Sequence, residues 1–159
     1  MPIIHYKPEK FGTYAGPLFR NPGELKVSWG ELCWAAITVG RRNWPDVTAH
    51  GLYSLFEIQW RLTMLWANLL EMPDGKLAKT DAFHNLDPSE KGAITFFIGN
   101  TIAKLVAEKL FDVPWLLHLD VYKDQLNPDL HLGGKPDFVG LDSSLSWIIM
   151  EAKGRTNSI

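Results

Sequence analysis

Two short strand-like segments, 137–141 and 147–153, carry acidic residues that are placed to act together. The segments are separated by five residues, so they can form an antiparallel hairpin centred on Ser144. In that register Asp137 lies opposite Glu151. Directly opposed residues in such a pair are about 5 Å apart. Two carboxylates at that distance can bind one divalent ion.

Lys153 belongs to the same group. Side chains alternate along a strand, so Lys153 emerges on the same face, and at the same end, as Asp137 and Glu151. The other residues of both segments are mainly apolar, as a covered sheet requires. Two acids and a lysine are costly to bury there without a ligand or a counter-charge. A lone E-x-K tripeptide is common by chance, but a Pro-Asp in a matching register makes the pattern more specific.

The two motifs together resemble a known family. Gly134-Lys-Pro-Asp137, followed after thirteen residues by Glu151-Ala-Lys153, resembles the Pro-Asp…(Asp/Glu)-x-Lys signature of the restriction-endonuclease-like nucleases. The helix–strand–strand–strand order expected from Asp87 onward is also similar to the core of that family. The resemblance implies an α/β (α+β) fold, in which a helix precedes a small mixed sheet of at least three strands.

The resemblance also implies a role for each residue. Asp137, Glu151 and the backbone carbonyl of Ala152 would bind Mg²⁺, for which Mn²⁺ may substitute. Lys153 would orient the attacking water and stabilise charge in the transition state. Glu90 would correspond to an acidic residue on the first core helix. The chemistry suits these residue types, because Mg²⁺ prefers hard oxygen ligands and lowers the pKa of bound water. A nearby cation stabilises developing negative charge.

The remaining candidates each have a structural explanation as well. Glu90 lies three residues after Asp87, where it would complete a helix capping box. His118 and Asp120 alternate onto one face of their strand, and a salt-bridged or hydrogen-bonded core pair explains them without a metal role. Four cations are candidates for contact with nucleic-acid phosphates, and an ordinary exposed position is the alternative for each: Arg41, Arg42, Lys135 and Arg155.

Periodicity predicts the elements that position these residues. A helix begins at the cap Asp87 and runs to about 110. A strand over 115–122 and a polar loop over 123–134 follow, and then the hairpin. These elements form a nuclease-like core over 87–159. In this family a second helix and a fourth strand normally follow E-x-K. Because these elements are absent after Lys153, we expect one of three situations: the sequence is a fragment of a longer protein, a partner chain completes the core, or the N-terminal half caps the sheet.

The N-terminal part, residues 1–80, is expected to be an accessory region. Residues 1–30 have the glycine and proline content of an irregular arm, and 31–39 form either a helix or a strand. A helix over 52–71 has an unusually wide apolar face. We expect that face to pack against the C-terminal sheet or a partner, with Trp60 and Trp66 as anchors. Residues 72–86 are expected to be a linker.

Composition excludes several classes of protein. Apolar residues make up 46% and charged residues 21% of the 159 residues, which argues against disorder. The net charge of −2 excludes a polybasic protein that holds nucleic acid or membrane by bulk electrostatics. The single cysteine, Cys33, excludes an intrachain disulfide framework. The start lacks the features of a signal peptide, and the long helix is too charged to cross a membrane, so we expect a soluble, cytoplasmic protein.

Two functions fit these observations. The first is Mg²⁺-dependent hydrolysis of phosphodiester bonds in DNA by an endonuclease, which the resemblance sets in restriction, phage defence or mobile-element processing. Action on RNA is a variant of it. The second is a non-cleaving, nuclease-fold scaffold subunit that binds a partner protein, or a further copy of itself, through its aromatic N-terminal surface. Residues 80–159 hold eleven acidic against seven basic residues, which favours the scaffold. The Asp137, Glu151 and Lys153 group favours the enzyme.

Overall fold

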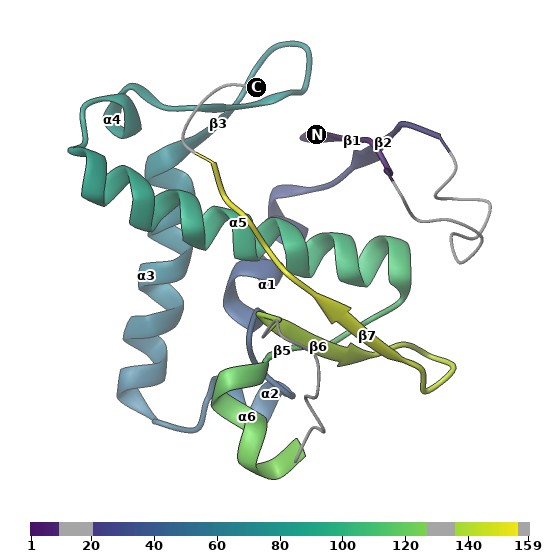
Figure 1. The fold of residues 1–159 in the computed structure, drawn as a ribbon. Helices are drawn as coiled ribbons and strands as arrows, with labels where there is room; N and C mark the ends of the chain where they lie inside the picture. The colour runs from purple at the N-terminus through teal and green to yellow at the C-terminus, as the bar shows by residue number, and fades with distance from the viewer. Residues whose placement is uncertain (10–20, 127–135, 156–159) are drawn as a thin grey trace.

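The computed structural model describes residues 1–9, 21–126 and 136–155. These residues form a mixed α+β structure with six helices and small antiparallel sheets (Figure 1). The C-terminal part contains helix α5 (Pro88–Phe111), followed by strands β5 (Leu116–His118), β6 (Phe138–Leu141) and β7 (Trp147–Met150). The strands pair in the order β5-β6-β7. The predicted helix followed by three strands is therefore present, but helix α6 (Leu119–Leu126) lies between β5 and β6, so the predicted uninterrupted order is confirmed only in part.

The sheet differs from the mixed sheet that we expected. Both of its ladders are antiparallel, and the parallel pairing that reaches it is one bridge between Gly40 and Leu117. The nitrogen of Gly40 donates a hydrogen bond to the oxygen of Leu116 over 2.8 Å. This contact attaches the end of helix α1 (Trp29–Thr38) to the free side of β5.

Helix α5 begins as the sequence predicted. Asp87 is its N-cap, with the carboxylate accepting from the nitrogens of Ser89 and Glu90, and Glu90 completes the capping box. The helix ends at Phe111, where Asp112 adopts a left-handed conformation with φ 57°. A chain reversal of this kind satisfies carbonyl groups at the helix end.

The strand predicted over 115–122 is wrong in its second half. β5 stops at His118, and helix α6 (Leu119–Leu126) follows directly. Leu119 and Tyr122 are both buried, and residues three apart share one face of a helix but not of a strand. As a result Asp120 lies exposed on α6 and does not share a strand face with His118.

The N-terminal part holds more regular structure than expected. Strands β1 (Ile3–Tyr6) and β2 (Gly23–Lys26) pair within the region predicted to be irregular. Residues 31–38 of the segment predicted over 31–39 lie within helix α1, and the short helix α2 (Trp44–Val47) follows it. The predicted long helix is α3 (Leu52–Asn68); it ends three residues early, because strand β3 (Leu69–Glu71) pairs with β4 (Leu77–Lys79). Helix α4 (Asp81–His84) occupies part of the predicted linker.

One hydrophobic core joins the two parts of the chain. Helix α1 packs against both α3 and α5 (Figure 1). Leu32 and Ala35 of α1 are buried together with Leu65 of α3 and Leu105 of α5. A second cluster links Val39 to the inner face of the sheet, where Phe138 is fully buried. The N-terminal helices and α5 therefore share one core.

The described helices include none with the length and the apolar character needed to cross a membrane.

Candidate active site

The hairpin that carries the motif has the register predicted from the sequence. Val139 pairs with Ile149, and Leu141 pairs with Trp147. The connecting loop is closed by the carboxylate of Asp142, which accepts from the nitrogens of Ser144 and Ser146, each over 2.8 Å. An aspartate side chain that bonds to the backbone two residues later stabilises such a turn. The register is therefore set at the loop and carried to the far end of the strands.

β7 ends before the E-x-K motif, so the strand predicted over 147–153 is too long. Its last ladder residue, Met150, pairs with Phe138. Beyond this pair the contact between the two segments is made by a side chain. Asp137 Oδ2 accepts a hydrogen bond from the backbone nitrogen of Ala152 over 2.9 Å. This hydrogen bond fixes Asp137 against the backbone between Glu151 and Lys153.

The charged groups of the motif lie together. Lys153 Nζ is 2.9 Å from Glu151 Oε1, and both side chains are exposed, at 73% and 55%. The hydrogen bond to Glu151 and the negative charge of Glu151 raise the pKa of Lys153; Asp137 adds to this effect and Arg155 opposes it. Lys153 is therefore a cation at neutral pH beside two acids. Whether both carboxylates reach one ion stays a prediction.

Helix α5 positions the chain just after the motif. A Cβ added to Gly154 would lie 2.3 Å from the carbonyl oxygen of Thr95, and one added to Gly99 would lie 3.1 Å from the Cα of Gly154. Backbone and helix thus meet at a glycine-to-glycine crossing, which Figure 1 shows where the chain beyond β7 passes over α5. Sequence reasoning did not assign these glycines to the site. The small residues on α5 were the signal that could have indicated the crossing.

The residues present fit a magnesium ion by the chemistry of their donors. Asp137, Glu151 and the carbonyl of Ala152 offer hard oxygen atoms at one end of the sheet. Within the described residues no three His, Cys, Asp or Glu side chains form a metal-binding group. Mg²⁺ is commonly bound by one or two carboxylates, with waters and substrate phosphates as its other ligands. Two acids and a carbonyl suit that mode of binding.

Glu90 does not join the other two acids in such a group. Its carboxylate accepts from the nitrogen of Asp87 over 3.3 Å within the capping box of α5. The structure therefore gives Glu90 a role in helix capping, and its catalytic role stays a prediction.

His118 lies beside the site on the inner side of the sheet. Its ring stacks on Phe138 with a centroid distance of 4.5 Å, and it packs so closely on Gly40 that a Cβ there would lie 2.1 Å from the ring. Burial lowers the pKa of His118, and the positive charges of Arg61 and Arg41 lower it further, against the opposing effect of Asp137. His118 is thus a packed residue whose surroundings favour the neutral form of the ring.

The predicted phosphate contacts have different surroundings. Arg41 Nη2 lies 2.5 Å from Glu57, which also pairs with Arg61, a residue that the sequence analysis did not single out. The four-residue spacing of Glu57 and Arg61 was the signal for that pair. Arg42 is bound to Asp46 and lies over the ring of Tyr122. Its position is explained by the contact between α2 and α6.

Two of the four predicted phosphate-binding cations remain, Arg155 and Lys135. Arg155 is exposed and close enough to Lys153 to lower the pKa of that lysine. Lys135 lies outside the described residues.

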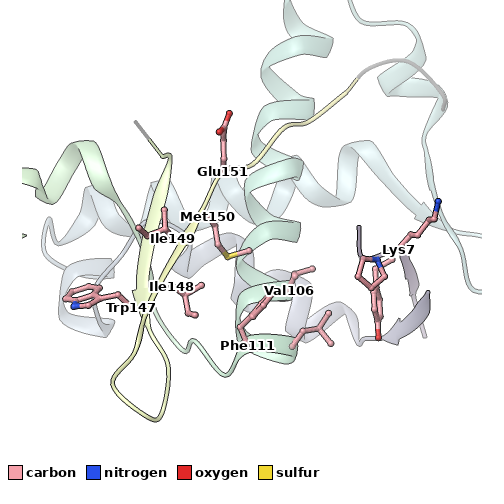
Figure 2. A pocket seen from close by; sticks show the side chains of 11 residues that line it. Lys7, Val106, Phe111, Trp147, Ile148, Ile149, Met150 and Glu151 are labelled. Carbon is pink, nitrogen blue, oxygen red and sulfur yellow. The ribbon is translucent and has the colours of Figure 1, made fainter. Parts of the chain in front are cut away.

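A pocket of about 510 Å³ runs beside β7 but is not suited to a phosphate (Figure 2). Its lining is mainly apolar and includes Val106, Phe111, Ile148 and Met150. Figure 2 shows the Glu151 carboxylate pointing away from this apolar lining. Glu151 is therefore the one residue of the motif that lines the pocket, and Asp137 and Lys153 do not line it.

No family model, curated protein or solved structure matches this chain.

Proposed function

We propose that this chain is a Mg²⁺-dependent nuclease that hydrolyses phosphodiester bonds in DNA. The observation that supports the proposal is the hydrogen bond from the Ala152 nitrogen to Asp137, which joins Asp137 to the backbone between the ion-paired residues Glu151 and Lys153. The hairpin register that produces this contact follows from the same spacing that resembles the nuclease signature. A cytoplasmic defence or mobile-element setting is part of the proposal and rests on that resemblance.

The proposed reaction assigns a task to each side chain. Asp137 and Glu151, with the carbonyl of Ala152, would hold the ion, which when bound polarises the phosphate and lowers the pKa of water. Lys153, a cation near both acids, orients the attacking water and stabilises the charge that develops on the phosphate oxygens. The water oxygen forms a bond to phosphorus and releases one proton to solvent, the bond to the leaving oxygen breaks, and the leaving oxygen takes up one proton from solvent.

Lys153 must leave Glu151 at least in part to act on the phosphate. The lysine side chain is 73% exposed, so it can turn toward a substrate without crossing packed side chains. Its ion pair is solvent-exposed, and exposed pairs of this kind contribute little to stability. The arrangement therefore leaves Lys153 available for a phosphate once the ion neutralises Glu151.

The exposed apolar residues favour a second candidate function, that of a non-cleaving scaffold. Trp60 and Trp66 on α3 are 44% and 54% exposed, although each was expected to be covered by the sheet or a partner. The expectation that this side of α3 packs against the sheet is wrong, since α3 contacts α1, α4 and α5 instead. A scaffold would use this surface and would need no metal.

Cleavage assays separate the two functions. Plasmid DNA, single-stranded DNA and RNA are incubated with the protein and Mg²⁺ or Mn²⁺, and EDTA and Lys153→Ala serve as controls. The nuclease proposal predicts cleavage of DNA that EDTA abolishes and that Lys153→Ala reduces. Metal-dependent cleavage of RNA alone would reassign the substrate, and no cleavage of any nucleic acid by the folded protein would favour the scaffold.

A further inference from the structure

The outward side of helix α3 is a broad surface without charge. Every exposed residue from Leu52 to Ala67 in this helix is apolar or neutral. Six of them are large apolar side chains that are 44–78% exposed, and we call these six the α3 face: Leu52, Tyr53, Leu55, Phe56, Trp60 and Trp66. Figure 1 shows α3 at the left edge of the molecule.

The charged residues of α3 are turned to the other side. Glu57 and Arg61 are the two charged residues in this helix, and they pair with each other. Arg61 Nη1 also donates to the carbonyl oxygen of Ala36 on α1 over 2.8 Å, and Arg41 reaches Glu57 from the end of α1. The two charged residues of α3 therefore interact with α1 and with Arg41, which follows α1. The outward side of α3 carries no charged residue.

The area of the α3 face matches what one side of a stable dimer needs. A large aromatic side chain buries about 150–250 Å² when it is enclosed. With the exposed fractions above, the six side chains present on the order of 600–700 Å². Standard interfaces bury about 600–1,000 Å² per partner. The largest apolar patch on a typical monomer is about 300–600 Å², so this face is at or above the upper end of that range.

Two of its aromatic rings are already held in place. Trp60 packs edge-on against Phe97 of α5 at 4.7 Å, and Trp66 stacks on Trp29 at 4.2 Å. Rings that are fixed before binding lose little conformational freedom on association. Tryptophan and tyrosine are also the residues that most often dominate binding energy at interfaces.

We propose that the α3 face is the interface of a homodimer, in which α3 packs against α3 of a second copy about a two-fold axis. An isologous interface sets the same patch of the two copies against each other, so a face with charges of one sign would repel itself. The α3 face has no charge to repel, and an apolar surface is complementary to a copy of itself. We place the two-fold axis perpendicular to the helices, so that the two copies of α3 run antiparallel.

Sedimentation velocity on the full chain over a range of concentrations tests this inference. The wild-type protein is expected to sediment as a dimer at micromolar concentration. Leu55→Glu and Phe56→Glu each place a like-charged pair in the interface, and each is expected to weaken the dimer at least about 100-fold. Val121→Glu is the matched control, because Val121 is 64% exposed on α6, outside the α3 face. Circular dichroism checks that each variant is folded.

The outcomes are separable from those of the nuclease proposal, because none of the three variants touches Asp137, Glu151 or Lys153. A wild-type monomer at 100 micromolar, or a dimer that survives both α3 substitutions, would overturn the inference. A monomer that co-sediments with neutral phosphatidylcholine vesicles would also overturn it and would assign the α3 face to a membrane surface. A dimer lost only in the α3 variants would support it.

Discussion

Gly154→Ala perturbs the candidate site without removing any of its functional groups. The added Cβ would lie 2.3 Å from the carbonyl oxygen of Thr95, whereas real Cβ contacts essentially never fall below 3.0 Å. The oxygen belongs to the backbone of α5 and cannot rotate away. The chain around residue 154 must therefore move by about 0.7 Å or more.

We expect this displacement to move the E-x-K motif, because the motif lies beyond the last hydrogen-bonded residue of β7 and is not held by the strand pairing. β7 pairing ends at Met150, and the hydrogen bond from Ala152 to Asp137 fixes the residues that follow. A shift of 1 Å in a catalytic geometry can cost about 100-fold in rate. We expect Gly154→Ala to reduce cleavage about 10- to 100-fold and to destabilise the fold by about 1–3 kcal/mol, as overpacking does.

Two further glycines on α5 provide a graded control series. Gly99→Ala places a Cβ 3.1 Å from Gly154, so a shift of a few tenths of an ångström relieves it, and its effect should be intermediate. Gly92→Ala meets no atom within 4 Å and should leave cleavage unchanged. Plasmid cleavage, urea unfolding and hydrogen exchange at the Ala152 amide measure the three variants. The reasoning fails if Gly154→Ala keeps wild-type cleavage and a protected Ala152 amide.

Three other predictions concern single side chains. Lys153→Ala should not lower the Mg²⁺ affinity measured by calorimetry but should slow cleavage about 100-fold or more, since its charge matters most in the transition state; an equal loss of both would contradict its role. The Arg42 side chain first, and then Tyr122, lower the pKa of Asp46 to about 2 from 3.8, so the stability that Asp46 contributes is present above pH 3.8 and is lost as pH falls toward about 2. The difference in melting temperature between wild type and Asp46→Asn should vanish over that interval, and a constant difference would refute it. Asp87→Ala should lower the melting temperature by about 2–4 °C through loss of the α5 cap, whereas an unchanged value would show that the cap is dispensable.

Local rules were sufficient for part of this structure. The Asp87 cap and the hairpin register follow from signals a few residues long: a capping box, and a loop closed by Asp142. The register then determines which residues meet at the far end of the strands. This is why the spacing of the two motifs alone predicts that Asp137 lies beside the E-x-K segment, where it contacts Ala152.

Other features depend on contacts that a local pattern does not contain. Strands β1 and β2 have four residues each, and they are stabilised by pairing with each other. They lie far apart in the sequence, so the periodicity of apolar residues within either segment does not reveal the pairing. The start of α6 depends on burial of Leu119 and Tyr122, which alternation alone did not reveal. The contact of Gly154 with α5 could be predicted only by knowing the direction that the chain takes after Met150.

The cleavage rate as a function of Mg²⁺ concentration, measured on plasmid DNA for the wild type and Asp137→Asn, tests the central claim most directly. Asp142→Asn is the matched control, because Asp142 is a carboxylate of the same hairpin at the opposite end. We predict saturable Mg²⁺-dependent cleavage in the wild type and in Asp142→Asn, and its loss in Asp137→Asn. Cleavage that Asp137→Asn leaves intact, or no Mg²⁺-dependent cleavage by the folded wild type, would contradict the account.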